Sequence, residues 1–176
     1  MRIGIAGSPG SGTTTLGKHL AEKYGLSFYS GGSFFRDAAA ERNMTLAEFG
    51  ELAKQNPDID YEVDRRQTKF ALDNDNIIIE SRLVGWMVKN ADLLILLSAS
   101  QKCRSERIAE REGLTPEESY RQTVEREKCE ADRYREYYQI DITSHEPYDL
   151  ILNTEKFSAD EVFVIASMAI ESLKKH

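Results

Sequence analysis

Five short apolar runs alternate with longer segments of helical periodicity along the chain. The runs cover residues 2–6, 26–30, 76–80, 92–98 and 148–153. The third and fourth, NIIIE and DLLILLS, lack the alternation of apolar and polar residues that marks a half-solvated sheet, so we expect central strands covered on both faces. Strands that alternate with helices indicate βαβ units. The pattern therefore predicts a three-layer α/β fold with five parallel strands.

Periodicity and capping pairs predict the helices between these runs. Leu16, Leu20 and Ala21 recur at helical spacing, and Gly25 ends that helix. A second helix is expected in SFFRDAAAERN, residues 33–43. Three later helices begin with Ser/Thr-x-x-Glu, in which the hydroxyl and the carboxylate each bond a backbone amide of the other residue. The pairs are Thr45 with Glu48, Thr115 with Glu118, and Ser158 with Glu161.

Composition narrows the class of protein. A chain of 176 residues, 40% of them hydrophobic, can bury one substantial core. The formal net charge of -7 argues against a surface for nucleic acid or anionic membrane. Neither a signal-peptide pattern nor a bilayer-length apolar run occurs, and Cys103 and Cys129 lack metal-ligand spacing. We expect a single-domain, cytoplasmic monomer without nucleic-acid or membrane partners.

The stretch GSPGSGTTT, residues 7–15, has the layout of a phosphate-binding loop whose lysine is replaced. Gly7, Gly12 and Thr14 match G-x-x-x-x-G-K-[ST], but Thr13 stands at the lysine position. Between a strand and a helix, such a loop turns its amide hydrogens toward an anion, whereas the alternative is a tight structural turn. Thr14 would present its hydroxyl to Mg²⁺. The residues expected to bind the nucleotide are Gly7, Ser8, Pro9, Gly10, Ser11, Gly12, Thr13, Thr14 and Thr15.

Arginines must supply the charge that Thr13 removes, because Lys18 lies more than a turn along the helix and should point away. Composition alone makes residues 100–138 a solvated helix pair laced by ion pairs, but the phosphate loop favours a mobile lid. Arg126 and Arg133 are seven residues apart and share a helix face. The arginines expected instead in surface ion pairs are Arg107, Arg111 and Arg135.

Five segments have the order and spacing of a known family. GSPGSGTTT, YSGGSFFR, DIDYEVDRRQ, IIIESRLVGWMVKNADL and TVEREKCEADRYR resemble archaeal-type cytidylate kinases over nearly the whole chain. Threonine at the lysine position is usual there, so the resemblance implies a working loop. It also implies a P-loop NTPase fold and ATP- and Mg²⁺-dependent phosphorylation of CMP and dCMP to their diphosphates. Its implied parts are a core (about 1–30, 76–100 and 146–176), a helical acceptor-binding insert (about 31–75) and a helical lid (about 101–140).

The resemblance assigns the acceptor phosphate to two places. Gly31 and Gly32 would let the monophosphate approach the chain, and Arg36 would reach it. Arg82 follows the third strand, where ligands bind in such sheets. It is expected to act on the transferring group together with Arg126 and Arg133.

Other candidates concern the base and the metal. Asp60 and Asp64 share a helix face that reads the exocyclic amine or the ribose of CMP, or is a solvated acidic face. Arg66 is favoured over its neighbour for the base or phosphate, and Glu80 is expected to hold Mg²⁺ through water. Trp86 is expected to pack against the sheet rather than stack on a base.

One departure from the bacterial enzymes keeps the substrate open. Those carry an acidic residue directly after the strand-end arginine, where this chain has Leu83. The alternatives are a P-loop kinase for another acceptor, such as AMP, dTMP or a metabolite, and a nucleotide-binding module without catalysis.

Overall fold

Five parallel strands form the central sheet, in the order β2-β3-β1-β4-β5. The computed structural model describes residues 1–173, apart from the side chains of Leu46, Ala47 and Lys54. The strands are β1 (Arg2–Gly7), β2 (Ser27–Ser30), β3 (Ile77–Glu80), β4 (Leu93–Ser98) and β5 (Leu150–Asn153). Each predicted run forms a strand, within two residues of its expected ends, and the predicted parallel sheet is confirmed.

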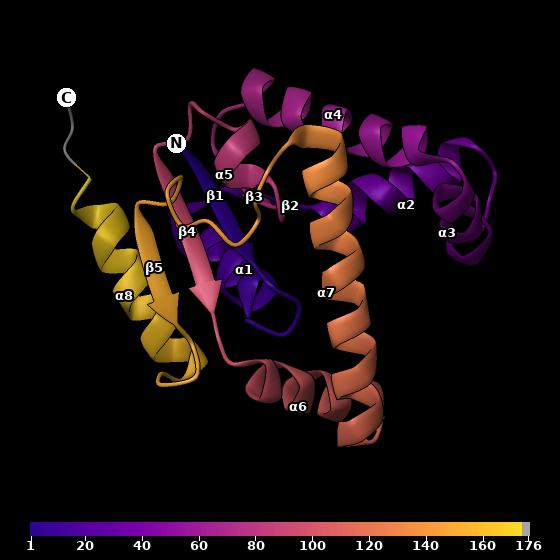
Figure 1. Ribbon diagram of the computed structural model, residues 1–176. Coiled ribbons are helices and arrows are strands. Elements are labelled where there is room, and N and C mark those ends of the chain that lie inside the picture. Colours follow the sequence, from indigo (N-terminus) through magenta and orange to yellow (C-terminus); the bar gives the residue numbers. More distant parts are fainter. Residues whose placement is uncertain (174–176) are drawn as a thin grey trace.

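Helices cover the sheet on both faces, which makes three layers (Figure 1). On one face lie α1 (Thr13–Tyr24) and α8 (Ala159–Glu171), and on the other lie α4 (Pro57–Asp73) and the short α5 (Val84–Met87). The first core cluster includes Ile3, Ile5, Leu20, Ile95 and Ala166. The second includes Ala6, Ala71, Ile77, Ile79 and Val84. Among the described residues, no helix is long and apolar enough to cross a membrane.

The carboxyl ends of the strands meet at one edge of the sheet. Ser30 is in register with Glu80, and Glu80 with Ile5 of β1. Gly7 at the end of β1 is in register with Leu97 of β4. Each of these strands therefore delivers the residues that follow it to the same edge, where open α/β sheets bind their ligands.

Three helices between β2 and β3 build a smaller apolar cluster of their own. They are α2 (Gly31–Glu41), α3 (Leu46–Gln55) and α4, and the cluster is Ala38, Ala39, Phe49, Ile59 and Val63. Helix α2 starts two residues before the predicted 33–43, because Ser30 and Ser33 cap it reciprocally, each hydroxyl accepting the other's amide at 3.2 Å. Gly31 and Gly32 thus lie in the first turn of a helix and not in a loop.

A helix pair, α6 (Gln101–Glu112) and α7 (Pro116–Tyr138), stands across from the carboxyl edge of the sheet (Figure 1). Its two helices are joined by a buried bond from the Ser119 hydroxyl to the Ser105 carbonyl at 2.7 Å. The predicted reciprocal caps form at Thr45 and Ser158. At Thr115 only half of the cap forms, the hydroxyl accepting the Glu118 amide at 3.2 Å.

Candidate active site

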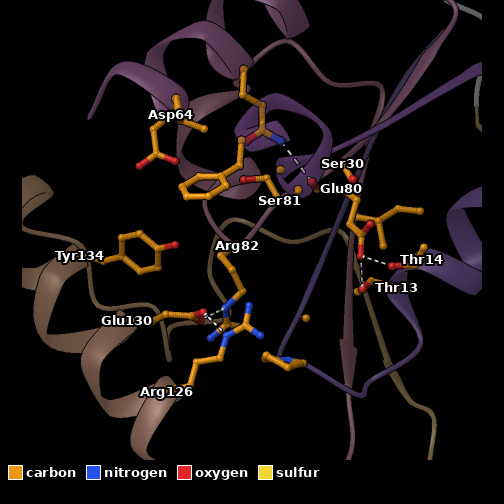
Figure 2. A pocket seen from close by; sticks show the side chains of 18 of the residues that line it. Thr13, Thr14, Ser30, Asp64, Glu80, Ser81, Arg82, Arg126, Glu130 and Tyr134 are labelled. Carbon is orange, nitrogen blue, oxygen red and sulfur yellow. Dashed lines mark hydrogen bonds and ion pairs between the residues drawn. The ribbon is translucent and has the colours of Figure 1, made fainter. Parts of the chain in front are cut away.

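A cavity of about 700 Å³ opens at the carboxyl edge of the sheet, between the glycine loop and helices α4 and α7 (Figure 2). It brings together residues from segments that are far apart in the sequence. The predicted site residues that line it are Gly7, Pro9, Gly10, Thr13, Thr14, Gly31, Gly32, Asp60, Asp64, Glu80, Arg82, Arg126 and Arg133.

The glycine loop turns through two left-handed positions before α1 begins. Gly10 has φ 84° and Gly12 has φ 95°. A Cβ on Gly10 would stand 2.6 Å from the Arg104 carbonyl oxygen, so this position has no room for a side chain. The Ser11 amide donates to the Ser8 carbonyl at 3.0 Å and closes the turn. Because α1 starts at Thr13 with a glycine N-cap and no side-chain cap, its first amides remain available to an anion.

Two threonine hydroxyls converge on one carboxylate oxygen at the end of β3. Thr13 Oγ1 donates to Glu80 Oε1 at 2.5 Å, and Thr14 Oγ1 donates to the same oxygen at 2.7 Å. Both groups offer oxygen, which Mg²⁺ prefers. The described residues contain no group of three or more His, Cys, Asp and Glu that could hold a metal ion. A magnesium ion would therefore use Thr14 and Glu80 and take its other ligands from water and phosphate.

Glu130 of α7 holds two of the predicted catalytic arginines, and sequence reasoning missed it. Arg82 Nε lies 3.1 Å from Glu130 Oε2, and Arg126 Nε lies 3.0 Å from Oε1 (Figure 2). Arg82 also donates to the Ser8 hydroxyl at 3.2 Å. The Glu130 side chain is only 11% exposed, so it is largely enclosed between the two cations. The two guanidinium groups thus lie together beside the glycine loop.

Arg133 and Asp60 form an ion pair across the cavity. Arg133 Nη1 lies 2.8 Å from Asp60 Oδ2, which links α7 to α4. Arg126 and Arg133 do face the same cavity, as their spacing predicts. Each guanidinium is paired with a carboxylate here, Arg126 through Nε and Arg133 through Nη1, so its other N–H donors can contact a phosphate while the pair is kept.

The surroundings of Asp64 on α4 shift the pKa of its carboxyl. It accepts a hydrogen bond from the Tyr138 hydroxyl at 2.9 Å. Burial raises the pKa of the Asp64 carboxyl to about 6, although Tyr138 and Arg133 act in the opposite direction. Asp60 adds to the rise as a nearby like charge. The interpretation of this pair as a solvated acidic face does not fit, because both side chains are only partly exposed and each is bonded to α7, Asp60 by Arg133 and Asp64 by Tyr138.

Two arginines of α6 contact the glycine loop from behind. Arg107 was expected in a surface ion pair, and this is wrong: its Nη1 donates to the Gly10 carbonyl at 3.2 Å and its Nη2 to the Thr154 carbonyl at 2.7 Å. Arg104, which sequence reasoning missed, donates to the Pro9 carbonyl at 3.1 Å and pairs with Glu127. Arg104 is the fourth residue of α6, whose N-cap is Ser100, and the sequence around it is that of an ordinary charged helix, so no local signal marks it.

The remaining predicted residues lie at the rim or elsewhere. Arg36 is exposed on α2, with its Nη1 3.5 Å from where a Cβ on Gly32 would stand. Arg66 does not line the 700 Å³ cavity. Its side chain pairs with Glu41 at 2.5 Å and with Glu62 at 2.7 Å. The surroundings of three other residues are as follows. Arg111 lines the cavity and pairs with Glu112, Arg135 is exposed, and Trp86 packs edge-to-face on Tyr148.

A second cavity of about 260 Å³ flanks the other side of the glycine loop. Its lining includes Gly12, Thr15, Arg107, Thr154 and Phe157. Residues of the loop therefore line both cavities, Gly10, Thr13 and Thr14 the first and Gly12 and Thr15 the second.

Comparisons with known proteins identify the family of the chain. A model of the cytidylate kinase-like family matches residues 2–156. A cytidylate kinase of Methanocorpusculum labreanum is 59% identical over 175 residues, which are 99% of each chain. The cytidylate kinase of Pyrococcus horikoshii is 49% identical over 171 residues, covering 97% of this chain and 88% of that protein.

Solved structures support the fold. A shikimate kinase from Acinetobacter baumannii in complex with shikimate aligns with a TM-score of 0.65 at 16% identity, over 99% of this chain and 95% of that one. An uncharacterized protein from Eubacterium ventriosum aligns with a TM-score of 0.75 at 18% identity, over 98% and 99%. These likenesses bear out the predicted fold of a P-loop kinase.

Proposed function

The chain belongs to the cytidylate kinase-like family, and from this membership we propose that it transfers the γ-phosphoryl group of ATP to CMP, giving CDP and ADP. The observation that carries the proposal is that Arg82, Arg126 and Arg133 line one cavity. The glycine loop and the α4 residues Asp60 and Asp64 bound the same cavity. Phosphoryl transfer needs alignment and positive charge around the equatorial oxygens more than covalent help. We propose dCMP as a second acceptor and UMP as a poorer one.

The donor is proposed to lie along the glycine loop. Its triphosphate would contact the amides of residues 7–15, and its base would enter the side cavity beside Arg107 and Phe157. Thr14 and Glu80 would hold Mg²⁺, which would offset the charge of the phosphates. The hydrogen bond between Thr14 and Glu80 supports this assignment, because it holds the hydroxyl oxygen and a carboxylate oxygen 2.7 Å apart.

The acceptor phosphate is proposed to lie between Arg82 and the first turn of α2. One of its oxygens attacks the γ-phosphorus, the bond from that phosphorus to the β,γ-bridging oxygen breaks, and ADP leaves with the electron pair. Arg126 and Arg133 would bond the transferring group through the N–H donors that Glu130 and Asp60 do not use. Arg36 would contact the acceptor phosphate from the rim beside Gly32. Charge-assisted bonds of this kind are strong in a site that excludes water.

The base is proposed to face Asp60 and Asp64. At neutral pH the Asp64 carboxyl, with its pKa of about 6, is mostly ionised and accepts hydrogen bonds. The 4-amino group of cytosine donates to such a carboxylate, whereas the O4 of uracil would face it with a lone pair. This repulsion is a reason for selectivity that does not need an acidic residue at Leu83.

We further propose the roles of the chain's parts. Residues of about 31–75 act as the acceptor-binding insert and about 101–140 as the lid, on a core of about 1–30, 76–100 and 146–176. The two closing over the cavity would limit wasteful hydrolysis of ATP. The enzyme is proposed to work as a cytoplasmic monomer.

A coupled assay of ADP release tests the function across CMP, dCMP, UMP, AMP and dTMP with Mg²⁺ and ATP. We expect CMP and dCMP to have the highest kcat/KM. If AMP or UMP ranks above both, the substrate assignment is wrong, and if no acceptor stimulates ADP release, the chain is a binding module.

A further inference from the structure

We propose that Arg104, Arg107 and Thr154 are positioning residues that hold three successive carbonyls of the glycine loop outward and so aim the amides of Gly10 and Gly12 at the triphosphate. The inference rests on the proposed function, because it concerns the site where ATP is proposed to bind. It explains how the loop works with threonine in place of lysine.

Each of the three residues bonds a different peptide of the loop. Arg104 Nη1 donates to the Pro9 carbonyl at 3.1 Å. Arg107 Nη1 donates to the Gly10 carbonyl at 3.2 Å, and Thr154 Oγ1 donates to the Ser11 carbonyl at 2.9 Å. The donors come from α6 and from the end of β5, outside the loop itself. Three consecutive peptide planes are therefore fixed from one side.

The fixed carbonyls determine where the amides point. In a trans peptide the C=O and the following N–H face opposite ways. With the Pro9 and Ser11 carbonyls turned toward their donors, the amides of Gly10 and Gly12 face away from them. The amide between these two, that of Ser11, is used within the loop, because it donates to the Ser8 carbonyl at 3.0 Å. Alternate amides thus remain for the phosphates.

The donors are themselves held in place. The Arg104 side chain is 7% exposed, bonds the Ala99 carbonyl at 3.0 Å and pairs with Glu127 of α7. Arg107 donates to both the hydroxyl and the carbonyl of Thr154, at 3.0 and 2.7 Å. A donor fixed by several bonds loses little conformational freedom when the ligand binds.

The charge of Arg104 adds to this effect. A guanidinium at the carbonyl end of a peptide polarises it, so that its N–H end becomes more positive toward the phosphate. The side chain of Thr13, at the position of the usual lysine, bonds Glu80 and brings no cation. Arg104, which bonds the peptide that carries the Gly10 amide, therefore supplies part of the positive potential that an ammonium group would supply directly. Arg107 acts indirectly, because its two bonds to Thr154 hold the donor to the Ser11 carbonyl in place.

Titration with a ligand that has no base separates positioning from base contact. Wild type, Thr154→Val and Arg107→Met are titrated by calorimetry with Mg-ATP, with inorganic tripolyphosphate and Mg²⁺, and with CMP alone. Loss of one of these bonds is expected to raise the Kd of Mg-ATP and the Kd of tripolyphosphate by the same factor, roughly three- to tenfold. The Kd of CMP is expected to stay within about twofold of its wild-type value. Thr154→Ser, which keeps the hydroxyl, is expected to restore tripolyphosphate binding.

Two further variants protect the test against unfolding. Arg104→Gln is combined with Glu127→Gln, so that no buried charge is left without its partner. This double variant is expected to weaken the binding of tripolyphosphate in the same way. Arg121→Met, on the exposed side of α7, is the matched control and is expected to change no affinity. Thermal melting identifies any variant that has lost its fold, and the remaining variants then decide.

The possible results separate this inference from the proposed function. Unchanged tripolyphosphate binding in folded Thr154→Val and Arg107→Met overturns the inference, as does a loss confined to ATP, which would mean a contact with the base. Both results leave CMP phosphorylation by the wild type untouched. A wild type that binds tripolyphosphate but phosphorylates no monophosphate instead overturns the proposed function.

Discussion

Thr13 donates its hydroxyl to Glu80 over 2.5 Å, so the residue at the usual lysine position binds the carboxylate at the end of β3. Thr14 donates to the same oxygen at 2.7 Å. A lysine here would bring a cation to the phosphates, but it would also form an ion pair with Glu80. The two threonines instead orient the carboxylate while leaving its charge for a metal ion. Threonine at the usual lysine position thus takes part in the hydrogen bonding of the site.

Thr13→Lys tests whether the native loop is impaired. Because backbone amides and arginines already balance the phosphate charge in our account, we expect kcat/KM for ATP to change by less than about tenfold in either direction. Steady-state kinetics at saturating CMP measures this. Thr13→Met, which removes the hydroxyl without adding charge, is the control that isolates the loss of the Glu80 bond. A gain of more than about a hundredfold in Thr13→Lys would show that the loop lacks a cation.

Arg126→Met and Arg133→Met remove the proposed contacts to the transferring group. Each is expected to lower kcat by about 10³, as loss of a transition-state arginine does, with a smaller effect on the Kd of CMP. Single-turnover kinetics and CMP titration separate the two quantities. Arg121→Met on the same helix is the control and should keep the wild-type rate. Normal turnover in both test variants would remove α7 from the catalytic account.

Asp64 links the site to stability through pH. Its pKa is raised from the usual 3.8 to about 6. The folded state therefore holds the proton more strongly than the unfolded state, and the free energy of unfolding falls as the pH rises from about 4 to about 6. The full cost of ionised Asp64 above that range is at most about 3 kcal/mol.

Asp64→Asn removes this cost and is expected to stabilise the protein by about 1–3 kcal/mol at pH about 7.5, with no gain below pH about 4. It should also lower the preference for CMP over UMP. Urea unfolding at both pH values and paired kinetic assays measure the two effects. Asp132→Asn, at an exposed position of α7, should change neither. Equal stability of wild type and Asp64→Asn at both pH values would mean that the carboxyl is not buried as described.

Two glycines with opposite surroundings provide a matched pair. A Cβ on Gly10 would stand 2.6 Å from the Arg104 carbonyl oxygen at φ 84°, so Gly10→Ala is expected to abolish ATP binding. A Cβ on Gly50, within α3, would meet nothing within 4 Å. Gly50→Ala should therefore raise stability by about 0.5–1 kcal/mol and leave activity unchanged. Calorimetric titration with ATP and thermal melts compare the pair, and normal ATP affinity in Gly10→Ala would contradict the geometry of the loop.

The sheet could be predicted because its signals are local. NIIIE and DLLILLS are continuous apolar runs, and Thr45 and Ser158 begin helices by contacts within one turn. The start of α2 was predicted two residues late, since Ser30 caps with Ser33, a pair outside the usual capping pattern. The glycine loop could be recognised from spacing alone.

The partners of the charged residues could not be predicted in the same way. Arg82 and Glu130 are 48 residues apart, and Arg104 and Glu127 are 23 apart. Such pairs depend on how α7 lies against the sheet edge, which periodicity does not determine. Arg107 appears in the sequence as one of many exposed charges of a helix, and only the fold brings it to Gly10.

The most direct test of the central claim is a crystal structure with Mg²⁺, a non-hydrolysable ATP analogue and CMP. We expect the triphosphate against residues 7–15, with its oxygens bonded by loop amides and by Arg126 or Arg133, and cytosine facing Asp64. A triphosphate that lies anywhere else in the molecule would contradict the account.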